Sequence, residues 1–412
     1  MQRKDTPLFM KKHLPIILVL LLSFLLHILF LVEHPGYFNL HGSRDAQKYD
    51  EMAHRLIEEG IYAYNSEESN AYVTPAHPLY LTGIILLADV ISIDYMVLVR
   101  LFNMVLSITT VWLVYAIPKR LFEMETISIL SALLYGTYLA PLHYFRSMLT
   151  ETPSIFMFMF SIYIFIAAIQ TKSTKLHVLF GFTASIAIMF RPTPAPMLLF
   201  AWAIVIYQTG FKNAMKVGLI WWIGPLFIIF PWSIRNLIVL GAPYIFSSHS
   251  GNPMLLGTNP YYLIPEETLA AKWREIGIEQ REYAIIRIID GFRYQFALWF
   301  SWFTLGKTIW MFQQPEPIGN YYKFLITPAK WYIYLNHFFV VFSSFITGLI
   351  FRKHKPLFCL FIILVSYLAI SNVFLPLTRY GSFIFPVMCI IGSYGAVVIA
   401  QKLVQLKRKI VS

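Results

Sequence analysis

The sequence predicts an all-α polytopic membrane protein, and three observations support that prediction. Hydrophobic residues make up 58% of the 412 positions, and 17% of the positions are aromatic. Only 13% are charged, whereas about 25% of a soluble globular domain is charged. The apolar residues also fall into separate runs near the roughly 20 residues that a membrane-spanning helix needs. Two or three soluble domains, the usual expectation for this length, are therefore excluded.

The first apolar run, residues 14–32, is predicted to be an uncleaved membrane span. Basic residues precede it, it is longer than a signal-peptide core, and no small-residue cleavage site follows it. Nine further runs have the composition of spans: 95–117, 126–145, 152–170, 177–191, 194–208, 217–234, 331–351, 357–376 and 380–400. We therefore expect one integral membrane domain over residues 1–412, with about ten transmembrane helices and no soluble C-terminal domain.

The charges of the loops predict which way the chain is oriented. With ten spans, the N-terminal side of the membrane carries only Asp5, Glu123 and Glu125 as acids. Short loops rich in Lys and Arg are typical of the cytoplasmic face. The basic residues on this side are Arg3, Lys4, Lys11, Lys12, Lys119, Arg120, Lys172, Lys175, Lys212, Lys216, Arg352, Lys353, Lys355, Lys402, Lys407, Arg408 and Lys409. Two long polar segments, 33–75 and 235–330, then lie on the outer face.

Two other apolar stretches, 76–93 and 295–312, are long enough to be considered as spans. Counting either one alone would move later basic loops to the opposite face, against the usual charge distribution. Counting both would restore the two ends of the chain but invert the middle. We expect both stretches to lie at the outer membrane interface.

Composition also argues against two other classes of protein. The formal net charge is +12, but the positive residues lie between apolar stretches rather than on a polar domain, so nucleic-acid binding is not expected. The two cysteines, Cys359 and Cys389, lie inside apolar runs without a metal-binding spacing. We expect both to be small core residues.

The first outer segment contains a predicted amphipathic helix over residues 44–60. Ser43 is a suitable N-cap, and Tyr49, Met52 and later apolar residues follow at helical spacing, so the helix should lie on the membrane surface. Asp45 begins the apolar face, whereas Asp50 is expected to point toward water. Asp45 either complements the positive end of the helix dipole or has a chemical role.

Ionisable residues at the outer ends of the spans are the strongest signs of function. Arg146 and Glu151 flank one short outer turn, and Arg191, Arg235 and Arg379 lie at three other span ends. Each arginine alone is explained by a side chain that reaches for the interface, and Arg146 and Glu151 by a simple ion pair. Together, the four guanidinium groups suit a phosphate, which they bind in a planar, bidentate manner.

Residues 247–260 form a turn-rich polar segment that includes His249 and Asn259. Such side chains suit a sugar or a phosphate, although a plain polar connection has the same composition. The chain contains no P-loop, no GxSxG or HExxH motif and no zinc-binding spacing. The usual signatures of ATPases and many hydrolases are therefore missing.

Taken in order, these motifs resemble those of the C-type membrane glycosyltransferases (GT-C). The resemblance is to enzymes that use polyprenyl-phosphate sugars, namely protein mannosyltransferases, aminoarabinose transferases and lipopolysaccharide-core galacturonosyltransferases. It extends along most of the chain. The matching pieces are Asp45 with Tyr49 and Gly60-x-Tyr62, Tyr72-x-Thr-Pro75-x-His77-Pro78-Leu-Tyr80, Thr150-Glu151-Thr-Pro153, Arg191-Pro192, Pro231-Trp232-x-x-Arg235-Asn236, Gly241, Gly251 to Asn259-Pro260, and Arg379-Tyr380.

The resemblance implies an inverting glycosyltransferase that moves a monosaccharide from a polyprenyl-phosphate donor to an acceptor hydroxyl on the outer face. Asp45 would be the general base, although many relatives have a second acid where this chain has Ala46. Glu151 would orient Asp45 or the acceptor, or would bind a divalent cation with it. Arg235 and Arg379, followed by Arg146 and Arg191, would bind the donor phosphate. Substrate contacts are expected from Tyr49, His77, Asn236, His249, Asn259 and Tyr380.

Several aspects remain open at the level of the sequence. No cofactor is assigned, and a divalent cation would be magnesium or calcium, which carboxylates suit. The acceptor is a lipid, a polysaccharide or a protein, and membrane lipids are the surroundings. The plasma membrane, with the active site on its extracytoplasmic face, is the expected location. An O-antigen-ligase-like or polymerase-like enzyme and a lipid-linked sugar transporter are the alternatives; the transporter is disfavoured because no repeats are evident.

Overall fold

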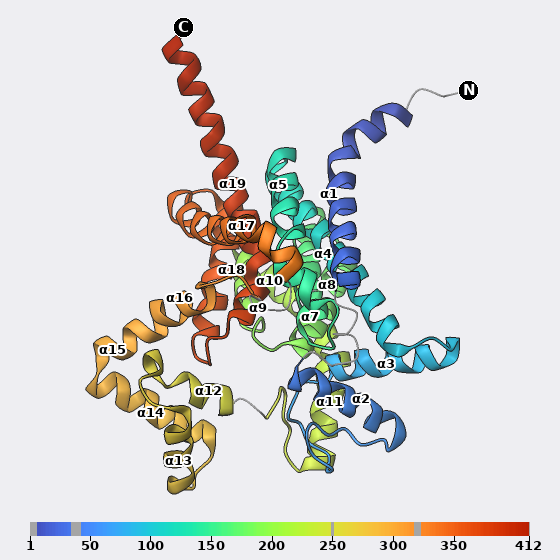
Figure 1. The fold of residues 1–412 in the computed structure, drawn as a ribbon, viewed down its shortest axis with the longest axis vertical. Coiled ribbons are helices and arrows are strands. Elements are labelled where there is room, and N and C mark those ends of the chain that lie inside the picture. Colours follow the sequence, from blue (N-terminus) through green and yellow to red (C-terminus); the bar gives the residue numbers. More distant parts are fainter. Residues whose placement is uncertain (1–5, 34–42, 249–250, 317–322, 412) are drawn as a thin grey trace.

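The computed structural model describes residues 6–33, 43–248, 251–316 and 323–411. All regular structure in these residues is helical. Long helices form a central bundle, and the two chain ends leave it at the same end (Figure 1). Shorter helices of the two predicted outer segments gather at the opposite end, which is the end that contains α2 and α13 (Figure 1).

The described part of the chain has six helices that are long and apolar enough to cross a membrane. They are α1 (Thr6–Glu33), α4 (Tyr95–Phe122), α7 (Glu151–Thr171), α11 (Ile223–Leu240), α17 (Lys323–Ile350) and α19 (Thr378–Val411). Four shorter apolar helices fall on the other predicted spans: α5 (Glu125–Gly136), α8 (Thr174–Phe190), α9 (Met197–Thr209) and α18 (Lys355–Ser371). The predicted class, a polytopic all-helical membrane protein, is confirmed.

Three predicted span boundaries are corrected by the positions of proline and glycine. The run 126–145 is two helices, α5 and α6 (Leu139–Tyr144), because a ring at Pro141 would collide with the carbonyl of Thr137 in one continuous helix. Prolines 192, 194 and 196 delay the start of α9 to Met197. Helix α11 follows α10 (Phe211–Trp221) and continues to Leu240, where Gly241 ends it at φ +70°.

The two ambiguous stretches form helices that are not among the six long spans. The first is α3 (Ala76–Ile91), which in Figure 1 runs across the direction of α1. The second is broken into α15 (Phe296–Ser301), a π-helical turn η3 (Trp302–Gly306) and α16 (Lys307–Phe312). Exposed Leu86 and Val90 on α3 and Phe300 and Leu305 on the second stretch fit a position against the lipid interface.

The remaining helices of the outer segments are short. Helix α2 (Arg44–Glu58) confirms the predicted amphipathic helix, and its N-cap Ser43 accepts a hydrogen bond from Ala46 N at 3.1 Å. Asp50 was expected to point toward water but is only 6% exposed, because Tyr95 packs over it and donates to its carboxylate. The second outer segment forms α12 (Gly251–Gly257), η2 (Pro260–Tyr262), α13 (Glu266–Ile276) and α14 (Gln280–Tyr294).

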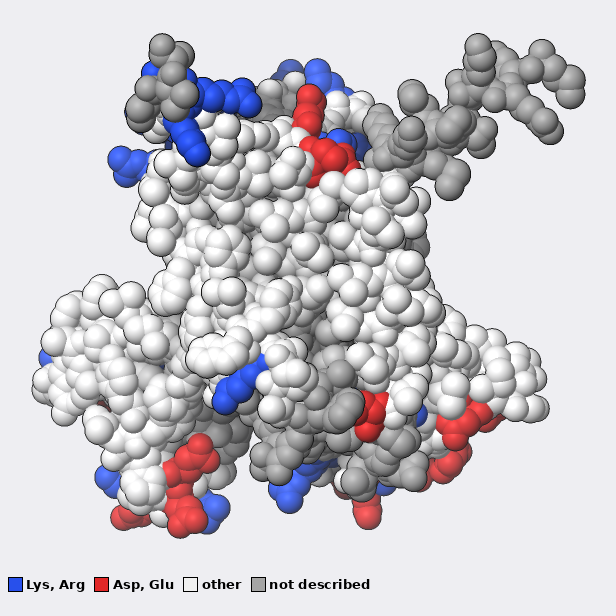
Figure 2. All heavy atoms as spheres, turned by 45° about the horizontal axis from the view of Figure 1, so that its top comes forward, with Lys and Arg blue, Asp and Glu red and all other residues white. Residues whose placement is uncertain are grey.

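Charged side chains lie mainly at the two ends of the molecule, with a largely uncharged band between them (Figure 2). Helix α19 occupies the middle of the bundle, and its residues Phe383, Phe385 and Met388 are fully buried. Cys389 is also buried, as expected, whereas Cys359 is only partly buried; both cysteines are free. The uncharged band has the character that a bilayer requires.

Glycine allows the closest helix contacts in the bundle. A Cβ atom built on Gly224 of α11 would lie 2.0 Å from the carbonyl oxygen of Gly181 on α8. A Cβ on Gly395 of α19 would similarly lie 1.8 Å from Oγ1 of Thr347 on α17. Helix association in membranes depends on such small residues, because lipid supplies no hydrophobic force between helices.

The α8–α11 contact gives a prediction about stability. Replacing Gly224 by alanine should force the two backbones apart, at a cost of about 1–3 kcal/mol, the usual range for overpacking. We expect thermal unfolding in detergent to show a lower Tm for Gly224→Ala. Gly83→Ala on α3 is the control, because a Cβ there meets nothing within 4 Å; equal Tm values for the two variants would contradict the prediction.

Candidate functional site

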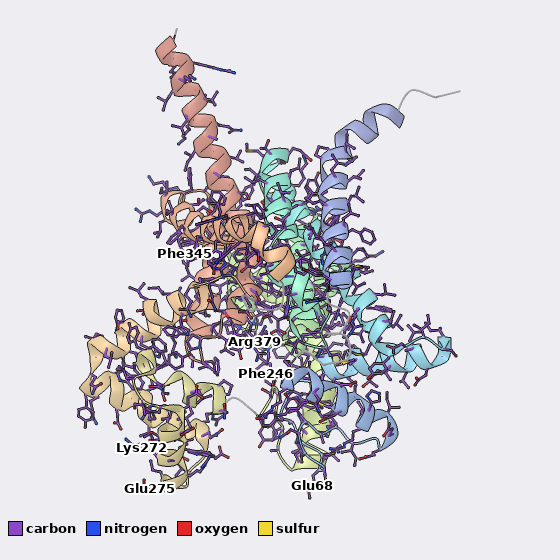
Figure 3. All side chains as sticks on the ribbon, in the orientation of Figure 1. Glu68, Phe246, Lys272, Glu275, Phe345 and Arg379 are labelled. Carbon is purple, nitrogen blue, oxygen red and sulfur yellow. The ribbon has the colours of Figure 1, made fainter. Side chains whose placement is uncertain are left out.

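A cavity of about 430 Å³ lies where the outer ends of the bundle helices meet the outer segments. Figure 3 places Arg379 at this junction, above Phe246 of the second outer segment. Six parts of the chain line the cavity: α2, the loop after α2, the start of α7, the α8–α9 turn, the segment before and into α12, and the start of α19 with the loop preceding it. The polar lining residues are Asp45, Lys48, Tyr49, Tyr64, Tyr72, Thr74, Thr150, Glu151, Arg191, Ser247, Asn252, Arg379 and Tyr380.

Asp45 and Arg379 form the ion pair at the centre of this arrangement. Nη2 of Arg379 lies 3.1 Å from Oδ2 of Asp45, a distance that also makes it a hydrogen bond. Tyr64 donates a second, longer bond of 3.4 Å to Oδ1. The Asp45 side chain is 42% exposed. Its carboxylate is therefore held in place and still accessible to a substrate in the cavity.

Glu151 and Arg191 form a second, deeper pair. Oε1 of Glu151 lies 3.9 Å from Nη1 of Arg191, and the Glu151 side chain is only 2% exposed. Its other oxygen, Oε2, is buried without a hydrogen-bond partner among the described residues. A buried, unsatisfied carboxylate oxygen is costly, so this atom is suited to receive a hydroxyl, a water molecule or a cation.

Tyr380 brings the two arginines to the same wall. The Arg191 guanidinium lies 4.9 Å from the centre of the Tyr380 ring, and the Arg379 guanidinium lies 5.3 Å from it. Stacking on an aromatic face leaves the edge of a guanidinium free to donate. Nε of Arg379 is one such donor that has no partner in the described part of the chain. Three cations, Lys48 included, therefore face two carboxylates in this cavity.

Aromatic side chains form the wall beside Asp45. Tyr49 packs edge-on against Tyr64 at 5.3 Å and against His77 at 4.7 Å between ring centres, and Tyr64 stacks on Tyr72. Burial raises the pKa of Tyr49, and the nearby carboxylates of Glu151 and Asp45 raise it further. Burial also raises the pKa of Tyr64 and Tyr72. These phenols therefore stay protonated and serve as hydrogen-bond donors.

His77 lies behind the cavity. Its Nε2 donates to the carbonyl of Met148 at 2.7 Å, which ties α3 to the turn before Glu151. Burial lowers the pKa of His77 to about 4, so the ring is neutral near pH 7. The structure therefore places His77 under Tyr49, away from the cavity surface.

Arg235 and Asn236 lie outside the cavity lining, in the last turns of α11. Arg235 donates to the carbonyls of Asn70 and Tyr62 at 3.0 and 3.3 Å, and Asn236 donates to the carbonyl of Tyr244 at 2.9 Å. These contacts fasten the loop after α2, which supplies Tyr64 and Tyr72 to the cavity, and the start of the second outer segment. Both side chains thus support the cavity wall from behind.

Two other predicted site residues also lie elsewhere, and a third is not described. Arg146 is buried and donates to the carbonyl of Phe30 at 3.1 Å, which anchors the end of α1. Asn259 is buried, and its side chain bonds to the backbone of Ile264. His249 lies outside the described residues. Of the predicted residues, the structure brings together Asp45, Tyr49, Glu151, Arg191, Arg379 and Tyr380.

The cavity also contains residues that were not among the predicted site residues. Lys48, Tyr64 and Tyr72 line it, and Asn252 faces it from α12. The spacing of three residues between Asp45 and Lys48 on one helix face was a usable signal for the lysine. The tyrosines lie in an irregular loop, where periodicity predicts nothing about direction.

Lys307 holds the loop that leads into Arg379. Its Nζ is fully buried and donates to the carbonyls of Asn372 and Phe374 at 2.7 and 3.1 Å. Trp302, in the π-helical turn, donates to the carbonyl of Gly257 at 3.0 Å. The main chain of Leu375 in turn donates to Pro253 O at 2.8 Å. Helices α12 and α16 thereby fix the loop 372–377 beside the cavity.

A divalent cation would find two carboxylates in this cavity. Asp45 and Glu151 both line it, and the unpartnered Oε2 of Glu151 suits a hard cation. No group of three or more His, Cys, Asp or Glu side chains with suitable spacing occurs in the part of the chain that the structure describes. Any cation here would therefore take much of its coordination from substrate or water.

Comparison with known proteins agrees with the fold. The sequence profile of the dolichyl-phosphate-mannose-protein mannosyltransferase family matches residues 76–234. This range includes Glu151, Arg191 and the first part of α11. None of the curated proteins matches the chain.

Solved structures of an archaeal oligosaccharyltransferase, AglB from Archaeoglobus fulgidus, share the fold. One, in complex with an inhibitory peptide and a dolichol-phosphate, is 14% identical with a TM-score of 0.55 and covers 97% of this chain and 52% of its own. The apo form is 13% identical with a TM-score of 0.54, and the match covers 97% of this chain and 52% of the solved chain. A complex with Zn and sulfate is 13% identical with a TM-score of 0.53, and the match covers 93% of this chain and 49% of the solved chain.

This chain therefore spans about half the length of those structures. The resemblance to the GT-C membrane glycosyltransferases that the motifs indicated is confirmed by the profile match over residues 76–234, and the fold is shared with the solved oligosaccharyltransferase structures. The family profile and the solved relatives both describe glycosyltransferases. The chain is a multi-pass membrane protein of that architecture.

The position of His77 gives a prediction about pH. Its pKa lies below that of an unfolded histidine, 6.5, so the unfolded state binds more protons between pH 6.5 and 4 and stability is lost as the pH falls through that range. From pH 7 to pH 5 the wild type should lose about 2 kcal/mol more than His77→Gln, which can still donate to Met148. Unfolding in detergent at both pH values measures this; parallel profiles would contradict it.

Proposed function

We propose that this protein is an inverting glycosyltransferase that moves a monosaccharide from a polyprenyl-phosphate donor to an acceptor hydroxyl. The observation that supports this most directly is the contact between Asp45 and Arg379, 3.1 Å apart in an open cavity at the outer ends of the membrane helices. A carboxylate there can accept the proton of a hydroxyl, and a guanidinium can receive a phosphate. Both groups are required at one reacting centre.

Asp45 is the proposed general base. An acceptor hydroxyl is a weak nucleophile, and a positioned carboxylate that removes its proton typically contributes 10²–10⁴-fold. The oxygen attacks the anomeric carbon from the face opposite the phosphate, so one carbon–oxygen bond forms as the other breaks and the configuration inverts. The proton goes to Asp45, and the bonding electrons leave with the lipid phosphate.

Arg379 is the proposed partner of the departing phosphate, with Arg191 and Lys48 beside it. Negative charge on the phosphate grows as the glycosidic bond breaks, and fixed cations in a poorly hydrated site stabilise that charge. Donor binding would also draw the Arg379 guanidinium away from Asp45. The carboxylate would then be released to face the acceptor hydroxyl only when a donor is present, which limits wasteful reaction with water.

Glu151 is the proposed orienting group. Its buried position and its pair with Arg191 keep the guanidinium directed into the cavity. Its free Oε2 would accept a hydrogen bond from the acceptor or from a bound water molecule. If magnesium or calcium takes part, Asp45 and Glu151 are the residues that would bind it.

Two observations support the proposed donor class and the proposed location of the cavity. The solved relative was bound to a dolichol-phosphate and a peptide, which supports a lipid-linked donor here. The basic loops at the end where the chain termini lie favour that end as cytoplasmic, which supports a cavity on the extracytoplasmic face of the plasma membrane. Cell-envelope glycans and glycolipids are the acceptors that meet this face, and a protein acceptor would meet it as well.

The product separates this proposal from its alternatives. Transfer from a monosaccharide donor releases a lipid monophosphate, whereas an O-antigen-ligase-like or polymerase-like enzyme releases a lipid pyrophosphate. A transporter of lipid-linked sugars releases neither. Analysis of the lipid product by mass spectrometry therefore tests the reaction class independently of the acceptor.

Replacing the proposed base should abolish most of the transfer. We expect Asp45→Asn to reduce the rate by 10²–10⁴-fold, because the amide cannot accept the hydroxyl proton. Mass spectrometry of envelope glycolipids, glycopolymers and glycoproteins, at matched membrane abundance, measures the loss. Glu51→Gln is the control, since Glu51 lies exposed on the same helix. An active Asp45→Asn variant would exclude this assignment.

Replacing the proposed phosphate partner should mainly affect the chemical step. Arg379→Gln is expected to lower kcat by about 10²–10³-fold, the range for losing one charge-stabilising donor. Arg379→Lys should retain part of the rate, because it keeps the charge but not the planar pair of donors. Arg274→Gln on exposed α13 is the control. Equal activity of Arg379→Gln and the control would exclude this role.

A further inference from the structure

A second cavity lies within the membrane band of the protein, between α7, α8, α9 and α18. Its volume is about 700 Å³, and it shares no lining residue with the Asp45–Arg379 cavity. The walls are almost wholly apolar, with side chains such as Phe158, Ile162, Phe180, Leu198 and Ile363. We refer to it as the α7–α9 groove. Its shape and lining suit a hydrocarbon chain.

Polar groups cluster at one end of this groove. They come from the end of α7, the end of α9 and the loop before α18, and they are Gln170, Tyr207, Gln208, Arg352 and Lys355. Helix α18 runs from this end to Ser371, just before the loop 372–377 that borders the first cavity. The polar end therefore lies a full helix length, about 25 Å for 17 residues, from Arg379.

Lys355 spans the mouth of the groove. Its Nζ lies 2.6 Å from Oη of Tyr207, to which it donates, and 5.0 Å from the centre of that ring. This contact joins α18 to α9 and places a cation over the opening. Arg352 lines the same end and is exposed. Both cations are exposed, and the Lys355 ammonium has further N–H donors besides the one directed at Tyr207, so both can meet an anion from the membrane surface.

The charge around the mouth is almost entirely positive. No acidic residue occurs between Glu151 and Glu266 or after Glu316, so the loops after α7, α9 and α17 contain none. Lys172 and Lys353 lie in the first and third of these loops, and Lys212 lies in the first turn of α10, directly after the second. Of the acids at this end, Glu125 is already paired with Lys119. An anionic ligand would therefore meet little opposing charge.

We propose that the α7–α9 groove binds an anionic phospholipid of the leaflet opposite the Asp45–Arg379 cavity. One acyl chain occupies the apolar groove, and Lys355 and Arg352 hold the phosphate. Basic pockets between membrane helices on the cytoplasmic side are suited to such head groups. A polyprenyl donor fits this site less well, because its phosphate must reach Arg379 at the other end of the bundle.

The end of the groove that is far from Lys355 lies next to the turn that borders the first cavity. Ile188, Pro194 and Met197 line that end, and they flank the turn that carries Arg191. A bound chain would pack behind this turn and hold Arg191 against Glu151 and Tyr380. This consequence for activity rests on the proposed function, whereas the binding of the lipid does not.

Native mass spectrometry of the full-length protein tests the binding. The protein would be reconstituted with phosphatidylglycerol or with phosphatidylcholine of the same chains, released into a mild detergent, and scored for retained lipid. We expect the wild type to retain phosphatidylglycerol at least fivefold more than phosphatidylcholine. The double variant Arg352→Gln/Lys355→Gln should lose this preference, while Lys407→Gln/Arg408→Gln, with the same change of charge on α19, should keep it.

A second variant tests the groove itself. Ala203 lines the groove but is exposed, so Ala203→Trp should fill the cavity without disturbing the core and should reduce retention of both lipids. Equal retention of the two lipids by the wild type, loss of preference in the α19 variant, or replacement of the phospholipid by an added polyprenyl phosphate would each overturn the proposal. Asp45→Asn should retain phosphatidylglycerol normally, which separates this proposal from the proposed enzymatic function.

Discussion

The ion pair between Asp45 and Arg379 is the contact around which the cavity is arranged. It joins a surface helix near the N-terminus to the central helix α19, across 334 positions of sequence. A charged group at the edge of a bilayer is costly unless it is paired or hydrated. The pair therefore holds α2 over the mouth of the cavity, and the same two groups are the ones that the proposed reaction uses.

The surrounding helices fix the positions of the two side chains in this pair. Helix α19 is the most deeply buried part of the bundle, and its first turn carries both Arg379 and Tyr380. Lys307 and the π-helical turn fix the loop that leads into it, while Arg235 fixes the loop opposite. Several charged residues thus act by holding the wall of the cavity, because unpaired backbone carbonyls at this depth need donors.

The two cavities differ in the polarity of their linings. The outer one combines cations, carboxylates and phenols at the membrane boundary, whereas the α7–α9 groove is apolar except at its opposite end. Both contact the α8–α9 turn, whose three prolines restrict its backbone. The two cavities therefore lie on opposite sides of the turn that carries Arg191, without sharing a lining residue.

The sequence by itself determined the class of fold, most span positions, the Ser43 cap and the resemblance to the GT-C enzymes, because these depend on local composition, periodicity and short motifs. It also indicated Asp45, Glu151, Arg191 and Arg379. Only the tertiary structure decided which arginines face the cavity: Arg146 and Arg235 look equivalent in sequence but bind backbone carbonyls. The sequence also did not indicate Tyr64 or Lys307. The direction of Tyr64, which lies in a loop, and the distant carbonyls that Lys307 binds are both set by packing between segments that are far apart in the chain.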